Sequence, residues 1–240
     1  GSWGRVFSVE GTEEQAALAS RYLAELEPHL DHEDPSQRLA ARSVATELRE
    51  GIEDFEHGDH FRALRHLGGP FRLLSNVFDV MPSGTPEADE NLVRRLEGVP
   101  AALEDMQATA AAGQAKGISV ARRQALSVSE QARHLAGPDS ALNGVVARVG
   151  NPARAEAALA NAKEAAAAFS RWLAAEYAPN APTEDGVGAE LYTRALSNLV
   201  GKDTDPMEAY EWGWEELGRL IGEMERIGTE ILPGAGWQAV

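Results

Sequence analysis

Residues 205–231 read DPMEAYEWGWEELGRLIGEMERIGTEI, and this stretch decides the fold class. Asp205 is a favourable N-cap residue, Pro206 suits the first helical position, and Glu208 completes a capping box. Large apolar residues then recur at spacings of three and four, interrupted only at Gly228; they are Met207, Tyr210, Trp214, Leu217, Ile221, Met224 and Ile231. This period is typical of one face of an α-helix, and its regularity predicts a packing seam rather than a cofactor site.

Helix-start signals of the same kind recur along the whole chain, whereas strand signals are nearly absent. A capping residue followed by proline opens three further segments, at Asp34-Pro35, Thr85-Pro86 and Asn151-Pro152, and Pro70 marks another start. The Asn151 segment is rich in alanine, and we expect its small side chains to let a neighbouring helix approach closely.

Two other helices are predicted from polar caps alone. Thr12 with Gln15 predicts a helix from residue 12 to about residue 30, and Ser119 predicts a cap for a helix that ends at Gly137. Pro100 is expected to interrupt the helix that begins after Thr85. We therefore predict an all-α chain with eight or nine helices in an irregular antiparallel array. The helices form a single region over residues 1–240, with a possible subdivision near residues 137–151.

Composition limits the classes of partner. The chain has 240 residues, a net charge of −16 and a pI of about 4.8, so it lacks the clustered positive charge that nucleic acids and anionic membranes reward. There is no run of eighteen apolar residues for a membrane span and no cysteine for a thiol nucleophile or Cys-ligated metal. We expect no nucleic-acid or membrane partner and a cytoplasmic location. The first residues, Gly1-Ser2, resemble what remains after an expression tag is cleaved off. A native signal peptide could have been removed when such a tag was attached.

The histidines offer only a weak metal hypothesis. His29/His32 and His57/His60 have the i, i+3 spacing that can place two imidazoles on one helical face, but zinc needs three or four converging ligands. The only His-Glu pair, His32-Glu33, does not continue as H-E-x-x-H, and no histidine is preceded at i−3 by glutamate as in di-iron bundles. We predict no metal site in this chain, with His57 and His60 kept as the alternative.

Few other residues suggest chemistry. No G-x-S-x-G nucleophile motif occurs, and the carboxylate pairs are typical of solvated helix faces. Arg95 is placed beside Leu92 and Leu96, where an inward guanidinium would bind a carboxylate. Two interpretations stay open for Arg95: a tie between helices, or a contact with a substrate carboxylate.

Several motifs, taken in order, resemble the bacterial family called domain of unknown function 885. They are Phe78-Asp79-Val80-Met81-Pro82 with Thr85, Arg95-Leu96-x-x-Val99-Pro100-x-x-Leu103, Gly113-x-x-x-Gly117 with Arg122-Arg123, the stretch 187–192 (VGAELY), and the closing block from Asp205 through ILPGAG at 231–236. The similarity covers essentially the whole chain.

This resemblance implies a zinc peptidase. Full-length family members resemble helical metallopeptidases that form a cleft, with the zinc ligands and a general-base glutamate downstream of the closing block. The chain is then expected to be the amino-terminal half, one wall of that cleft, inactive alone. Its partners would be the missing carboxy-terminal half and a peptide substrate, and zinc is expected only in the full-length protein. By the same resemblance Tyr192 faces the cleft, where a phenol can donate a hydrogen bond to a substrate carbonyl; the alternative is that Tyr192 packs with Leu196.

A hypothesis of a different class stays open beside the peptidase. The chain would then be a free-standing helical interaction module that buries a partner helix in a groove. Both hypotheses require an exposed apolar patch, and they differ in what covers it.

Overall fold

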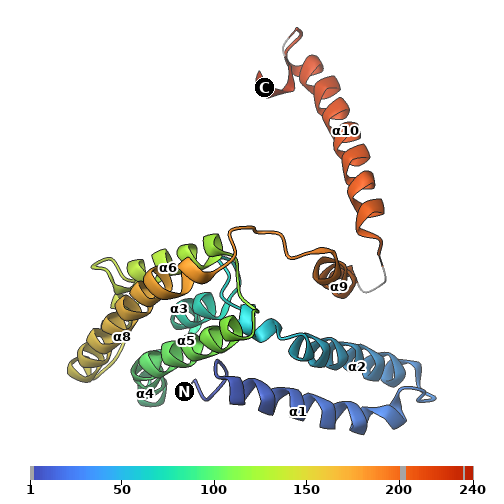
Figure 1. The fold of residues 1–240 in the computed structure, drawn as a ribbon. Helices are drawn as coiled ribbons and strands as arrows, with labels where there is room; N and C mark the ends of the chain where they lie inside the picture. Colours follow the sequence, from blue (N-terminus) through green and yellow to red (C-terminus); the bar gives the residue numbers. More distant parts are fainter. Residues whose placement is uncertain (1–2, 201–203, 235, 240) are drawn as a thin grey trace. The chain divides into compact units, whose positions relative to one another are not determined.

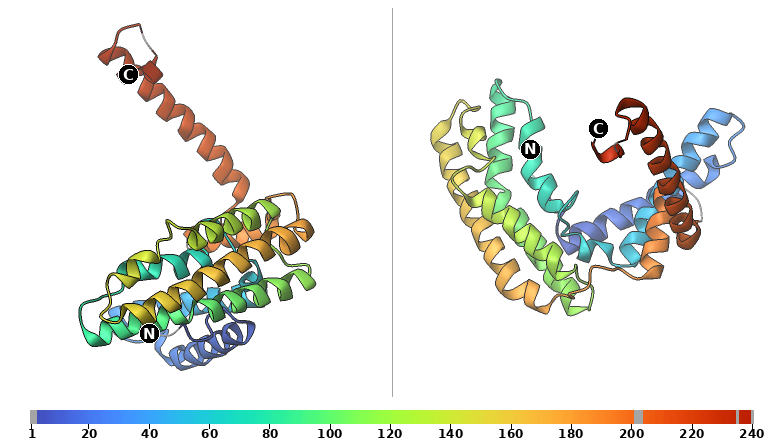
Figure 2. Two further views of the ribbon diagram at one scale, coloured as in Figure 1. Left: turned by 90° about the vertical axis from the view of Figure 1, so that its left-hand side faces the viewer. Right: turned by 90° about the horizontal axis from the view of Figure 1, so that it is seen from above.

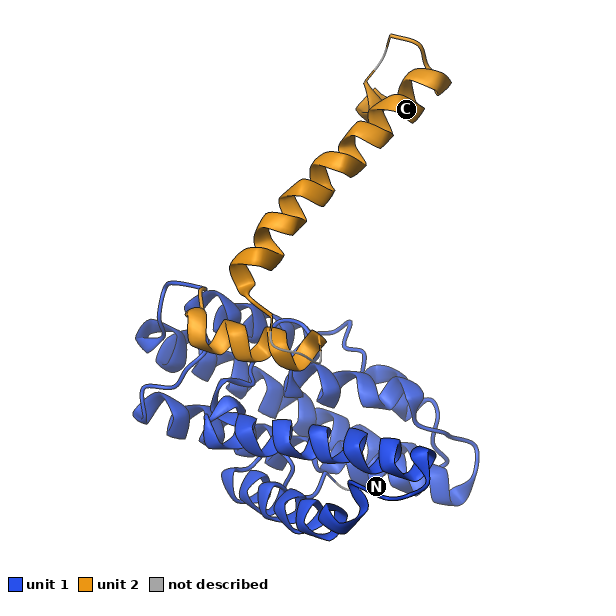
Figure 3. Ribbon diagram, turned by 90° about the vertical axis from the view of Figure 1, so that its right-hand side faces the viewer, with its two compact units in different colours: residues 1–185 blue, residues 186–240 orange. Residues whose placement is uncertain are grey.

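The all-α prediction is confirmed. The computed structural model describes residues 3–200, 204–234 and 236–239, and within these ranges it contains ten α-helices and no β-strand (Figure 1). The chain divides into two compact units, Gly1–Asp185 (unit 1) and Gly186–Val240 (unit 2) (Figure 3). The segment 137–151 lies inside unit 1.

Unit 1 contains eight of the helices and a set of single turns. The helices are α1 (Val9–Leu26), α2 (Pro35–Glu56), α3 (Pro70–Val80), α4 (Pro86–Glu97), α5 (Val99–Ala115), α6 (Arg122–Ala136), α7 (Asn143–Val146) and α8 (Pro152–Trp172). The turns are η1 (Glu27–His29), η2 (Asp59–Arg62), the π-helical turn η3 (Leu173–Tyr177) that continues α8, and η4 (Ala178–Asn180).

The centre of unit 1 is the close packing of α8 on α6, which lie side by side in Figure 2. The buried face of α8 contains a stripe of alanines, each at most 3% exposed: Ala155, Ala158, Ala162 and Ala166. The Ser129 and Ser170 hydroxyls each donate to the other residue's carbonyl oxygen at 2.8 Å, a reciprocal pair that requires the two backbones to be near. The expected close approach of a neighbouring helix is confirmed, and α4 and α5 pack on α8 as well.

A hairpin of α1 and α2 joins this bundle through a few residues. The two helices pack on each other, and the elements that connect the hairpin to the bundle are η2 and the contact of α1 with α5. Gly58 ends α2 with a φ of 75°, a left-handed conformation that favours glycine, and the chain then turns into η2.

The proline-marked helix starts are confirmed. Asp34, Thr85, Asn151 and Asp205 each accept a hydrogen bond from a backbone N–H of the first turn of their helix. Pro70 begins α3, and the chain between Thr85 and Ala115 is interrupted as expected, with Gly98 between α4 and α5.

Two predicted starts are wrong. Helix α1 begins at Val9 because the Ser8 hydroxyl, not that of Thr12, accepts the first-turn N–H, from Gly11. Helix α6 begins at Arg122, not after a Ser119 cap, because the Arg122 N–H donates to the Pro182 carbonyl at 2.7 Å and the preceding residues are extended.

Unit 2 consists of α9 (Ala189–Val200), α10 (Pro206–Ile231) and the short turn η5 (Trp237–Ala239). Helix α9 was not predicted, and it raises the count from at most nine to ten. Its sequence has no proline at the start, and Gly188 precedes it instead of a polar capping residue, so it lacked the signal that identified the others. None of the helices within the described ranges is both long and apolar enough to cross a membrane.

Candidate functional site

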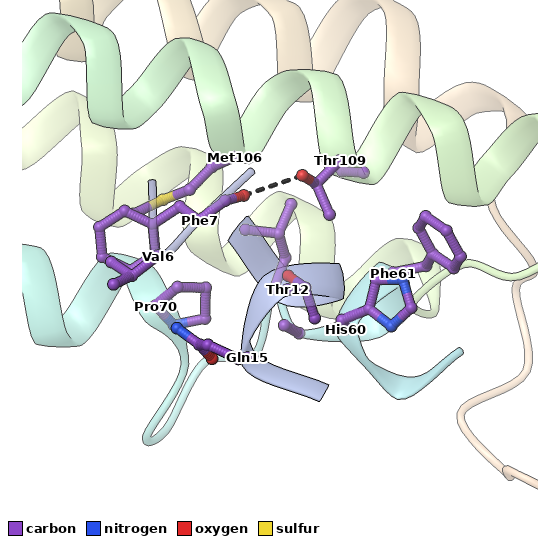
Figure 4. A pocket seen from close by; sticks show the side chains of 12 residues that line it. Val6, Phe7, Thr12, Gln15, His60, Phe61, Pro70, Met106 and Thr109 are labelled. Carbon is purple, nitrogen blue, oxygen red and sulfur yellow. Dashed lines mark hydrogen bonds between the residues drawn. The ribbon is translucent and has the colours of Figure 1, made fainter. Parts of the chain in front are cut away.

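Unit 1 contains a small pocket where the α1–α2 hairpin meets the bundle. Its volume is about 200 Å³, and its lining comes from the start of α1, from η2 and from α5 (Figure 4). The walls are mostly apolar, with Phe7, Phe61 and Met106 among them, and Gln15 and His60 add polar groups.

Glycine makes the pocket's inner wall possible. A Cβ atom on Gly113 of α5 would lie 2.4 Å from the Cβ of Phe61, so only glycine lets η2 pack this closely on α5. Phe61 is thereby buried, and the ammonium of Lys116 lies 4.6 Å from the centre of its ring.

The threonines at the pocket already use their hydroxyl protons. Thr109 donates to the Phe7 carbonyl at 2.8 Å, a contact drawn in Figure 4, and Thr12 donates to the Ser8 carbonyl at 2.9 Å. The first bond holds the segment before α1 against α5, and the second lies within the first turn of α1, so neither hydroxyl proton is offered to a ligand.

His60 is the titratable group of the pocket. Its ring stacks on Phe55 at 5.0 Å and lies 3.9 Å from the ring of Phe61, and its Nδ1 is buried without a hydrogen-bond partner. Burial lowers the pKa of His60, and the positive charge of Lys116 lowers it further, against the opposing effect of Asp59 and Glu13. The imidazole is therefore favoured in its neutral form.

The predicted metal pair does not gather further ligands. His57 Nδ1 lies 2.9 Å from the Glu53 carbonyl oxygen in a hydrogen bond at the end of α2, while the His60 ring stacks on Phe55 and is tilted against Phe61. No group of three or more His, Cys, Asp or Glu side chains suited to a metal occurs in the part of the chain that the structure describes. The His57/His60 site stays a prediction without structural support.

The other histidine pair, His29 and His32, also makes contacts within the fold. The His29 and His32 rings stack at 6.3 Å, and His32 Nδ1 accepts a hydrogen bond from the Asp34 N–H just before α2.

Arg95 and Tyr192, the predicted substrate contacts, fall in different units. Arg95 lies in α4 with its guanidinium 4.6 Å from the centre of the Trp3 ring, and the Trp3 indole donates to the Arg95 carbonyl at 2.8 Å. Tyr192 lies in α9 and is 53% exposed, so its unit leaves the phenol accessible. Neither unit by itself brings the two residues together.

The seam of α10 is uncovered within unit 2. Six of its large residues are 43–64% exposed: Met207, Tyr210, Trp214, Leu217, Met224 and Ile231. The exception is the end, where the chain turns back through Gly234 and Trp237 packs on Gly228; a Cβ on Gly228 would lie 2.9 Å from the Trp237 Cα. This contact explains why the apolar repeat is interrupted at Gly228.

The comparison with known families agrees with the resemblance of the motifs. The pattern of the family described as "Bacterial protein of unknown function (DUF885)" matches residues 1–240. The chain belongs to this family. A comparison with curated proteins gave no match.

The DUF885 chain also holds contacts that the sequence did not reveal. His66 Nδ1 lies 2.6 Å from the Ser127 hydroxyl and 3.1 Å from the Gln131 amide, and Gln131 donates to the His66 carbonyl. With the Gln124 side chain accepting from the His66 N–H, these bonds tether the loop before α3 to α6. The residues are about sixty positions apart, and no local pattern joins them.

The pocket was missed for the same reason. Its walls come from three segments whose separate sequences are unremarkable apart from glycine. Gly58 and Gly113 are the signals that could have pointed to it, because each marks a place where η2 must pack closely.

Proposed function

We propose that this DUF885 chain is the helical amino-terminal region of a zinc-dependent peptidase. In this proposal it forms one wall of the substrate cleft, and a carboxy-terminal half of the same protein holds the zinc and the general base. The match of the family over residues 1–240 supports the proposal, together with the resemblance of full-length family members to zinc peptidases that the motifs suggest.

The described residues do not fit the metal. They provide no group of three ligands, so a zinc ion of this protein would be held outside them. The chain itself would bind and orient the peptide, with the exposed Tyr192 as a hydrogen-bond donor and Arg95 as a contact for a carboxylate.

A second candidate is the free-standing interaction module. The uncovered seam of α10 favours it equally, because a regular apolar stripe is stable in water only when another surface covers it. Under the peptidase proposal that surface belongs to the same protein, and under the module it belongs to another chain.

The test compares residues 1–240 with the full-length protein that contains them. We expect the full-length protein to bind zinc stoichiometrically and to cleave a mixed peptide library, with loss of cleavage after chelation and recovery on adding zinc. Residues 1–240 alone are expected to do neither. A full-length protein without zinc and without cleavage would refute the peptidase; a stable complex of residues 1–240 with an unrelated helix would then support the module.

The roles of the site residues are tested in the same protein. Tyr192→Phe removes one donor and is expected to lower kcat by roughly 10²–10³ if the phenol stabilises the oxyanion. Tyr22→Phe is the matched control, since Tyr22 is a similarly exposed tyrosine on α1. Equal activity of Tyr192→Phe and the wild type would remove Tyr192 from the site.

A further inference from the structure

The two edges of the α10 seam differ in chemistry. In a heptad repeat the seam residues Met207, Trp214 and Ile221 occupy position a, and Tyr210, Leu217 and Met224 occupy position d. The edge beyond position d holds Leu220 and Ile227 at position g. These are 43% and 41% exposed, so this edge extends the apolar surface.

The edge beyond position a is acidic. It holds Glu211 and Glu225 at position e, with Glu208 and Glu215 at the neighbouring position b. All four are exposed, and among the residues that the structure describes none forms a hydrogen bond or ion pair with their side chains.

The remaining glutamates of α10 lie elsewhere and are neutralised. Arg219 pairs with Glu216 at 2.7 Å and with Glu223 at 3.0 Å, and Arg226 pairs with Glu230 at 2.5 Å. These three glutamates occupy position c, on the side of the helix away from the acidic edge. Negative charge is therefore uncompensated on one edge of the seam alone.

We propose that the α10 seam binds an amphipathic helix that carries lysine or arginine along one edge. An apolar stripe on such a helix would cover positions a, d and g. Its basic edge would lie against Glu211 and Glu225 and would supply the positive charge that α10 itself does not place on this edge. This inference goes beyond the proposed function and holds whether or not the protein is a peptidase.

A second copy of this chain fits the seam poorly. In an antiparallel pair position e faces position e, which brings the acidic edges together. In a parallel pair position e faces position g. The charged side chains of Glu211 and Glu225 would then lie against the apolar side chains of Leu220 and Ile227. The net charge of −16 adds general repulsion between copies.

The experiment uses residues 1–240 and three labelled helical probe peptides. The peptides share a leucine seam at positions a and d and differ only in one edge, which carries lysine, glutamine or glutamate. Fluorescence anisotropy at low salt is expected to show the lysine peptide binding about tenfold more tightly than the glutamine peptide, with no binding of the glutamate peptide. The difference should shrink as salt is added.

Variants separate the seam from its edge. Trp214→Glu is expected to abolish binding, and Trp212→Glu is the matched control, because Trp212 is equally exposed but lies at position f on the opposite side. The double variant Glu211→Gln with Glu225→Gln should remove the preference for lysine. Glu216→Gln, already paired with Arg219, should leave it unchanged.

Three results would overturn the proposal. One is equal binding of the three peptides. Another is a wild-type dimer in sedimentation that Trp214→Glu dissociates, which would make a second copy the occupant. The last is a Trp214 that acrylamide does not quench in the free chain, which would mean that the seam is already covered. Circular dichroism of every variant checks that α10 remains helical.

Discussion

Helices α8 and α10 show opposite relations between side-chain size and burial. The stripe of α8 is made of alanines and is almost completely buried, whereas the stripe of α10 carries tryptophan, tyrosine, leucine and methionine and is about half exposed within its unit. Both have the period of a helix face that packs. The difference teaches that an apolar helical period predicts contact with another surface but does not specify that surface. Helix α8 packs on α6, whereas no element of unit 2 covers the stripe of α10 over the described residues.

The largest expected effect on stability comes from replacing a leucine by alanine, a change that can be made once in each unit. Leu92→Ala removes a fully buried side chain from unit 1 and is expected to lower the free energy of unfolding by about 2–5 kcal/mol. Leu217→Ala removes a side chain that is 44% exposed within unit 2, so its effect should stay within about 0.5 kcal/mol. Urea unfolding measures both. Equal losses would mean that the seam is buried in the isolated chain.

A second substitution tests whether the alanines of α8 are needed for their size. Ala162→Leu adds bulk to the buried alanine stripe of α8 and is expected to cost about 1–3 kcal/mol. Ala160→Leu makes the same change on the exposed face of the same helix and should be nearly neutral. If both variants unfold like the wild type, the close approach of α6 does not depend on the alanine stripe.

The third prediction uses a cap motif that both units share. Asp205 begins α10 and Asp34 begins α2, each followed by proline and each accepting a first-turn N–H. Asp205→Ala is expected to lower the protection of α10 amides by about 1 kcal/mol, and Asp34→Ala to do the same for α2. Hydrogen exchange resolves the two helices. Loss of protection across unit 1 on Asp205→Ala would show that the units unfold together.

The capping residues and prolines at helix starts explain how much of the fold could be predicted from the sequence. Helices that start with a capping residue and proline were found because both residues act within one turn. The start of α1 was misplaced because Ser8, and not Thr12, supplies the local cap. The start of α6 was misplaced because tertiary contacts set it: Arg122 donates to the Pro182 and Ala178 carbonyls.

The candidate sites could be predicted only in part. The α10 seam was evident because it lies on one helix, although its lack of cover was not. The pocket around His60 was hidden because it joins η2, α5 and the start of α1, which the sequence does not place side by side. The histidine pairs had suitable spacing, but spacing alone does not make a third ligand converge.

The smallest effect should come from His60, a half-buried titratable group of unit 1 that contrasts with the exposed charges of α10. The folded-state pKa of His60 is lowered from its ordinary value of 6.5 by burial and by Lys116, so the unfolded chain binds the proton more readily. The resulting stability is present above pH 6.5 and is lost as the pH falls through the lowered pKa. His60→Phe keeps an aromatic ring and should remove this pH dependence, while acid loss from carboxylates, at lower pH, remains.

The cause of the shift can be tested through the neighbours of His60. Lys116→Met removes the positive charge but not the burial, so the pH dependence should become shallower without disappearing. Asp59 and Glu13 oppose the shift, and Glu13→Gln should make it steeper. Urea unfolding at a series of pH values from about 5 to 8, spaced by about one unit, measures how the free energy of unfolding changes with pH in each variant. If His60→Phe kept the wild-type slope, the titrating group would lie elsewhere, and the half-buried imidazole would not make the stability of the α1–α2 hairpin junction depend on pH.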